Sequence, residues 1–167
     1  MTAHIHTAAQ RGFSNAAQTY ARGRPEYSAD LLPWLAHDLA LEAGGQLGLV
    51  WNVRDGSVDW VKAITDIITP YEGDTPRFYK GDWRTPFTGR TFAPLKQRMF
   101  SYQHVGTAQE VILDRFLSVS FIATLAPNEN AQVAEQLRAL IASHPALRER
   151  DSIAFPYRTE VYWCTRL

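Results

Sequence analysis

Several side chains suited to binding a small molecule follow one short apolar run. Residues Leu47 to Val53 are almost continuously apolar and are preceded by glycines, which is typical of a strand buried on both faces. Four candidate contacts lie at or just after its end: Trp51, Asn52, Arg54 and Asp55. Ligands of α/β sheets bind outside the carboxyl ends of the strands, so we expect a binding site here. The alternative is that the same polar segment serves only as a turn.

A long loop from Tyr71 to Gly89 supplies two further candidates, Trp83 and Arg84. Glycines and prolines recur through this stretch, and loops of such length are often functional. The two side chains could contact a bound molecule. The alternative is that Trp83 covers the core as an aromatic plug.

Other residue types give no catalytic constellation. His4 and His6 have an alternating spacing, but two imidazoles near the N-terminus without a third ligand do not predict a metal site. Cys164 has no nearby base and is interpreted as a small packed residue. No serine lies in a nucleophile elbow. The sequence therefore predicts no metal, and the catalytic residue stays unknown.

Bulk composition indicates an ordinary globular chain. With 167 residues, 46% hydrophobic and 20% charged, we expect a single domain over residues 1–167. Seventeen basic residues balance seventeen acidic ones, which argues against a nucleic-acid or polybasic membrane partner. The single cysteine excludes an internal disulfide, and no apolar run reaches the roughly 18 residues of a membrane span. We expect a cytoplasmic protein without a signal peptide.

Periodicity predicts an alternation of helices and strands around the candidate site. Two helices are expected upstream, at Ser14–Tyr20 and Leu31–Leu41. The expected downstream elements are a helix capped by Ser57 with Asp59 in its first turn, a strand over Leu95–Val105, a helix started by the capping box Thr107–Glu110, a helix from Pro127 to His144, and a strand over Ile153–Thr165. Pro156 predicts a bulge or a strand end within the last of these.

Two separate blocks of the chain resemble one enzyme family. The segment from Phe13 to Tyr27 resembles the N-terminal segment of class I S-adenosylmethionine (SAM)-dependent methyltransferases of small molecules, in the trans-aconitate methyltransferase-like group. Residues Leu47 to Asp55 look like the fifth strand of that family, and Phe155 to Arg166 is similar to its closing strand. The resemblance implies an α/β fold: a truncated Rossmann-like sheet that keeps the last three strands, with the terminal strand antiparallel between the other two and helices packed against the sheet.

The resemblance also implies roles for residues. Residues 1–41 would be the N-terminal cover segment and helix, and residues 46–167 the C-terminal half of the methyltransferase fold. The family's cofactor contacts match Phe13, Tyr20, Arg24 and Tyr27. In such an enzyme a small-molecule acceptor, with a carboxylate as one candidate, would contact Trp51, Asn52, Arg54, Asp55 and Trp83.

The part of the family fold that holds SAM is missing between the two blocks. Family members carry there the first four strands, the glycine-rich SAM loop and the acidic residue that binds ribose. Gly44, Gly45 and Gly48 lie before and within a strand, on the wrong side for cradling a ligand. We therefore expect an internally truncated homologue with little or no activity, which needs no metal and binds SAM if it binds any cofactor.

Two alternatives remain open. The strand over residues 47–53 would lose its partner, and an unpaired strand edge favours association. The chain could thus be a non-catalytic interaction protein that pairs through this edge with itself, as a homodimer, or with an intact methyltransferase. It could also be an active enzyme that binds SAM in a dimeric or rearranged site.

Overall fold

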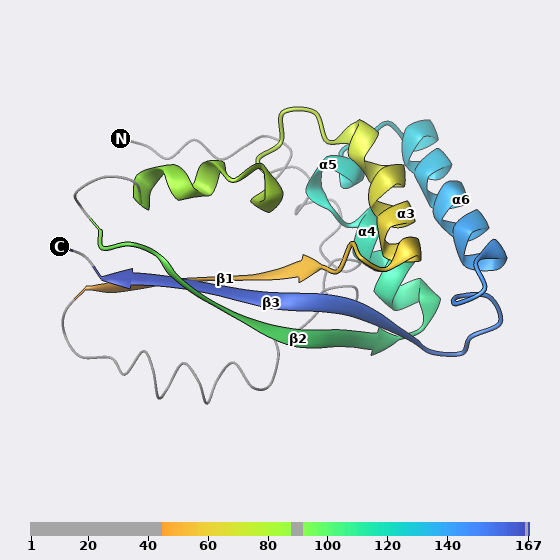
Figure 1. The fold of residues 1–167 in the computed structure, drawn as a ribbon. Coiled ribbons are helices and arrows are strands. Elements are labelled where there is room, and N and C mark those ends of the chain that lie inside the picture. The colour runs from red at the N-terminus through yellow and green to blue at the C-terminus, as the bar shows by residue number, and fades with distance from the viewer. Residues whose placement is uncertain (1–44, 88–91, 166) are drawn as a thin grey trace. The chain divides into compact units, whose positions relative to one another are not determined.

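The computed structural model describes residues 45–87, 92–165 and 167 of the chain (Figure 1). The two helices predicted upstream, and the cofactor contacts Phe13, Tyr20, Arg24 and Tyr27, lie outside these residues and stay predictions. The described residues form two compact units. One holds residues 55–75 and 104–155, and the other holds residues 45–54 and the described parts of 76–103 and 156–167. The prediction of a single domain stays a prediction.

Three strands form one sheet. They are β1 (Gln46–Arg54), β2 (Lys96–Gly106) and β3 (Ile153–Thr165), in the spatial order β1-β3-β2. β3 pairs antiparallel with β1, and Figure 1 shows it running opposite to both neighbours. The register extends from the pair Gln46 and Thr165 to the pair Arg54 and Tyr157. The three predicted strands are therefore confirmed, with the terminal strand in the middle.

β1 differs from the strand buried on both faces that its composition predicted. It lies at an edge of this three-stranded sheet, and its residues are half-buried or exposed. The buried strand is β3, in which four consecutive residues, Thr159 to Tyr162, are buried on alternating faces. An apolar composition indicates that a strand is shielded from solvent, but it does not show where the strand lies in the sheet.

Pro156 does not end β3, contrary to the prediction of a bulge or a strand end. The strand continues through Pro156, and the ladder with β1 begins one residue later, at Tyr157. Proline lacks a backbone N–H, so it is tolerated where no ladder bond to that neighbour is required.

The helical unit is built around two long helices. α3 (Asp59–Ile68) buries an apolar stripe and packs against α6 (Pro127–Ser143). The stripe of α3 consists of Trp60, Val61, Ile64 and Ile68, and α6 contributes Val133, Ala134 and Leu137. Phe155 lies fully buried beside them, with its ring centroid 5.0 Å from that of Trp60 and 5.6 Å from that of Phe116.

The beginning of α3 corrects one prediction. Ser57 does not cap the helix, because its backbone N–H and its hydroxyl both donate to Oδ1 of Asp55, at 3.1 and 2.7 Å. Val58 holds the N-cap position without a side-chain hydrogen bond, and Asp59 lies in the first turn as predicted. The carboxylate two residues earlier thus engages the hydroxyl of Ser57, which is not the acceptor for the first N–H groups of the helix.

The capping box at Thr107 is confirmed, and it opens an irregular helix. Glu110 Oε2 accepts from the backbone N–H of Thr107 at 2.9 Å, and the backbone N–H of Glu110 donates to Thr107 Oγ1 at 3.3 Å. The bonds that the Glu110 carboxylate accepts from the backbone N–H and from the hydroxyl of Thr107 lower the pKa of the Glu110 carboxyl. The chain then forms a π-helix over Gln109–Asp114, followed by the short helices α4 (Arg115–Leu117) and α5 (Ser120–Ala123).

Replacing Phe155 by alanine should lower the free energy of unfolding by about 3–5 kcal/mol, because it opens a cavity between Trp60 and Phe116. The matched variant Phe155→Leu keeps most of the volume and should lose roughly 1.5 kcal/mol or less. Urea denaturation followed by tryptophan fluorescence measures both values. Equal losses for the two variants would show that the site collapses around a smaller side chain and that the packing argument is wrong.

Candidate functional site

A pocket of about 310 Å³ lies beside the last four residues of β1. Its walls come from two chain segments, Trp51 to Arg54 on β1 and Pro76 to Tyr79 in the connection that follows α3. The register places the Trp51 side chain on the sheet face that carries Glu160, while Asn52 shares the other face with Thr159. Because residues from both faces line it, the pocket lies beside the end of β1 and is not confined to one face of the sheet.

Asn52 is fixed on its face of the sheet by a direct hydrogen bond across the strands. The hydroxyl of Thr159, which is fully buried, donates to Asn52 Oδ1 at 2.7 Å. The bond occupies the amide oxygen of Asn52 and leaves the orientation of the side chain defined. Asn52 thus lines the pocket from a rigid strand rather than from a mobile turn.

An aromatic cluster backs the pocket on the other face. Gly81 has φ of +81°, a conformation that L side chains rarely adopt, and it joins two 3₁₀ turns, Phe78–Lys80 and Asp82–Phe87. The turn brings Phe78 and Trp83 into a stack with 5.6 Å between centroids, and Trp83 Nε1 donates to the Phe78 carbonyl at 3.1 Å. Trp51 packs against both rings, at 5.0 Å from Phe78 and 4.5 Å from Trp83.

A buried polar cluster centred on Tyr162 continues from these rings. Tyr162 is 3% exposed, and its hydroxyl donates to Glu160 Oε2 at 2.6 Å. The same hydroxyl oxygen accepts from Gln97 Nε2 at 2.8 Å and from Arg84 Nη2 at 3.0 Å. The Arg84 guanidinium also lies over the ring of Trp83, 4.2 Å from its centroid. The aromatic wall and the polar cluster are therefore one connected structure.

The electrostatics of the cluster follow from burial and from the pairing of Tyr162 with Glu160. Burial, and next the hydrogen bond to the Glu160 carboxylate, raise the pKa of the Tyr162 phenol, while Arg84 opposes the shift. Glu160 is 6% exposed and receives donors from Tyr162 and Gln97, with Arg158 Nη2 at 3.6 Å from its second oxygen. A buried carboxylate requires such donors, so the cluster is a satisfied network that holds the wall of the pocket.

The structure brings together some of the residues that the sequence singled out. Trp51, Asn52 and Arg54 line the pocket, and Trp83 packs directly behind Trp51. Asp55 does not line it: its carboxylate holds Ser57 at the turn before α3. The role of these residues in substrate binding stays a prediction.

Several residues of the site escaped the sequence reasoning. Arg77 and Phe78 were missed because nothing in the loop composition tells which turn folds against β1. Glu160 and Tyr162 were missed because no local pattern indicates that both faces of β3 are buried. One sequence feature could have drawn attention to Glu160, since it is the one carboxylate in a strand rich in apolar and aromatic residues.

The eight residues that line the pocket carry two guanidinium groups, Arg54 and Arg77, and no carboxylate. Its chemistry therefore favours an anion with a flat apolar part, which the guanidiniums and the rings of Trp51 and Phe78 would contact. Within residues 45–87, 92–165 and 167, no group of three histidine, cysteine, aspartate or glutamate side chains is arranged as metal ligands. In the same residues, no helix has the length and hydropathy of a membrane span.

No family model matches the chain. It is nevertheless similar to curated proteins. An uncharacterized methyltransferase-like protein of Schizosaccharomyces pombe is 29% identical over 143 residues, which cover 80% of this chain and 55% of that protein. An uncharacterized methyltransferase of Mycobacterium tuberculosis is 33% identical over 119 residues, which cover 71% of this chain and 46% of the relative. These relatives support a methyltransferase family for the chain. The chain spans about half the length of the curated relatives that it matches.

Replacing Tyr162 by phenylalanine should lower the free energy of unfolding by about 1–3 kcal/mol, because Glu160 loses a buried donor.

The raised pKa of Tyr162 also makes the stability of the chain depend on pH. The protonated Tyr162 phenol contributes its full stabilisation of the folded state below the unfolded pKa of 10.0. This stabilisation is lost as the pH rises through the higher folded pKa, because the unfolded chain binds fewer protons than the folded chain in that range.

An alkaline titration followed by phenolate absorbance should show one late step among the seven tyrosines, absent from Tyr162→Phe. The control Tyr79→Phe changes a tyrosine that is 59% exposed and should keep that step. A late step that survives in Tyr162→Phe would assign the raised pKa to another residue.

Proposed function

We propose that this chain is an internally truncated homologue of SAM-dependent methyltransferases of small molecules, in the trans-aconitate methyltransferase-like group. It retains an acceptor-side pocket and has little or no methyl-transfer activity. The single observation that carries the proposal is the similarity to proteins named methyltransferases over about half of their length. The two sequence blocks that resemble the beginning and the end of the family fold support it.

The sheet is compatible with the C-terminal half of such a fold. β3 lies antiparallel between β1 and β2, which is the arrangement expected for the closing strand between the fifth and sixth strands of the family. In this proposal the first four strands are the part that the chain lacks. The sequence also has no glycine-rich turn that opens a helix, which is the feature that binds SAM in this family.

The pocket beside β1 suits an acceptor better than it suits SAM. The sulfonium of SAM is cationic, and its ribose is usually held by a carboxylate, whereas the pocket presents Arg54 and Arg77 and no lining carboxylate. A small carboxylate with a planar body would instead meet two guanidiniums and the rings of Trp51 and Phe78. We therefore assign acceptor binding to Trp51, Asn52, Arg54 and Arg77, with Trp83 supporting Trp51 from behind.

A thermal melt of the purified chain tests both halves of the proposal. Trans-aconitate should raise the melting temperature, because a ligand at one hundred times its dissociation constant stabilises the native state by about 2.7 kcal/mol. SAM and its demethylated product should leave the melting temperature unchanged. Arg77→Gln should abolish the shift with trans-aconitate, and the matched control Arg98→Gln, an exposed arginine of β2 outside the pocket, should retain it.

A shift with SAM would contradict the loss of the donor site and would favour an active enzyme with a dimeric or rearranged site. No shift with trans-aconitate, or an equal loss in both arginine variants, would contradict the assignment of the pocket to a carboxylate acceptor.

A second candidate function rests on the position of β1 at an edge of the three-stranded sheet. An edge strand is a template for pairing with another chain, and β1 carries no lysine or proline that would discourage pairing. In this proposal the chain pairs through residues 47–53 with a second copy or with an intact methyltransferase.

Sedimentation equilibrium over a hundredfold range of concentration should then show a monomer–dimer equilibrium. Leu47→Lys places a charge on the pairing strand and should weaken the dimer about tenfold or more, whereas the control Lys96→Leu on β2 should not. A stable monomer at high concentration, with the amides of β1 protected from hydrogen exchange, would refute pairing through this edge.

A further inference from the structure

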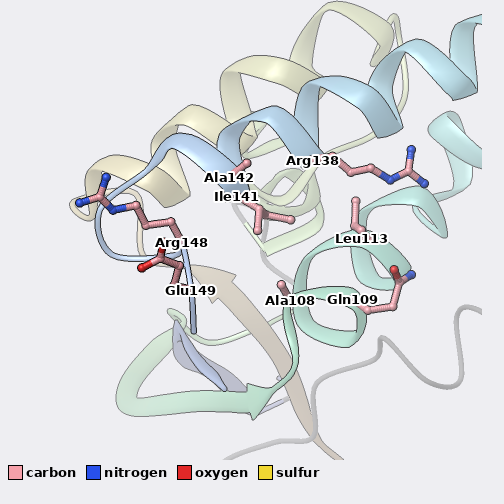
Figure 2. A pocket seen from close by; sticks show the side chains of 8 residues that line it. All are labelled: Ala108, Gln109, Leu113, Arg138, Ile141, Ala142, Arg148 and Glu149. Carbon is pink, nitrogen blue, oxygen red and sulfur yellow. The ribbon is translucent and has the colours of Figure 1, made fainter. Parts of the chain in front are cut away.

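The helical unit contains a second pocket, of about 490 Å³, that the proposed methyl-acceptor chemistry does not use. It lies between the π-helix and the C-terminal half of α6, and the turn after α6 closes one side (Figure 2). Its apolar lining consists of Ala108, Leu113, Ile141 and Ala142. Its volume falls within the range of roughly 300–1,000 Å³ that is usual for small-molecule sites.

Charged side chains flank this apolar floor. Figure 2 shows Leu113 and Ile141 in the space between the two helices, with Arg138 on one side and Arg148 on the other. Arg138 is paired only loosely with Glu135, at 3.8 Å between exposed groups, so this pair contributes little. The lining holds two guanidiniums against the single carboxylate of Glu149, which gives it a net positive charge.

Two irregularities of the backbone meet at this pocket. The π-helix over Gln109–Asp114 supplies Gln109 and Leu113 to the lining, and π-helical turns are frequent at functional sites. Glu149 has φ of +58°, and it is the one residue other than glycine with positive φ in the described part of the chain. Such a conformation costs free energy that the surroundings must offset.

A hydrogen bond to a buried carboxylate holds the Gln109 side chain in place. Its Nε2 donates to Oδ1 of Asp114 at 2.8 Å, and Asp114 is 6% exposed. The hydrogen bond anchors a polar lining residue to a buried carboxylate, so this wall of the pocket is preformed. A preformed wall lowers the entropic cost of binding.

We propose that this pocket binds a small amphipathic anion, a carboxylate carried on an apolar body. The apolar body would lie on Leu113, Ile141 and Ala142, and the carboxylate would face one of the two guanidiniums that flank them, Arg138 at one end or Arg148 at the other. A cationic amphiphile would meet two like charges and one opposite charge, so the pocket selects the anion. This site is independent of the pocket beside β1, because the two share no lining residue.

Titration of the isotope-labelled full chain with decanoate, followed by amide NMR shifts, tests the proposal. Decanoate should shift residues 108–113 and 138–149 in a saturable way. Acetate has the same head without the body, decyltrimethylammonium has a similar body with the opposite charge, and both should bind at least about tenfold more weakly. Equal binding of the ammonium compound, or decanoate shifts centred on other residues, would overturn the proposal.

Two pairs of variants separate site binding from stability. Ala142→Trp should fill the pocket and weaken decanoate binding about tenfold or more, while Ala139→Trp, on an exposed position of the same helix outside the lining, should leave it unchanged. Arg138→Gln with Arg148→Gln should weaken binding about tenfold, and Arg150→Gln should not. Equal effects within either pair would overturn the assignment, whatever the outcome of the trans-aconitate and SAM melts.

Discussion

The hydrogen bond between Tyr162 and Glu160 is the constraint around which the β1 pocket is organised. Both residues are buried on one face of β3, and a buried carboxylate is tolerated only with donors around it. Gln97 donates to the same Glu160 oxygen, and both Gln97 and Arg84 donate to the Tyr162 hydroxyl oxygen. Because Arg84 also lies on the ring of Trp83, the polar network and the aromatic wall stabilise each other.

Two different kinds of contact make the pocket beside β1 rigid. On one face of the sheet, Thr159 fixes the Asn52 side chain by a hydrogen bond. On the other face, Trp51 is held between Phe78 and Trp83, whose turn depends on the left-handed conformation of Gly81. Lining residues that are held by a strand and by stacked rings keep their geometry without a ligand, which favours binding.

The helical unit uses a different principle. Its core of α3 and α6 is regular, and the irregular backbone is concentrated where the π-helix and Glu149 border the second pocket. The π-helix also contributes Val111 and Ile112 to the core, while Gln109 and Leu113 line the pocket. The same irregular turn therefore both stabilises this unit and supplies residues that could bind a ligand.

The sequence by itself determined the elements and their ends where local chemistry decides them. Alternation of side chains predicted the strand over Ile153–Thr165, and the pair Thr107 and Glu110 marked the start of a helix. Pro127 and His144 marked the two ends of α6. These predictions succeeded because periodicity, capping and proline geometry act within a few residues. It also singled out Trp51, Asn52 and Arg54 before the pocket was seen. The order of the strands, with β1 at the edge and β3 in the middle, was implied by the family resemblance and not by any local pattern. Only the tertiary structure decided that Asp55 turns to Ser57, and that Arg77, Glu160 and Tyr162 belong to the site. Strand order and the folding of a long loop depend on contacts between distant residues, and no local pattern encodes them.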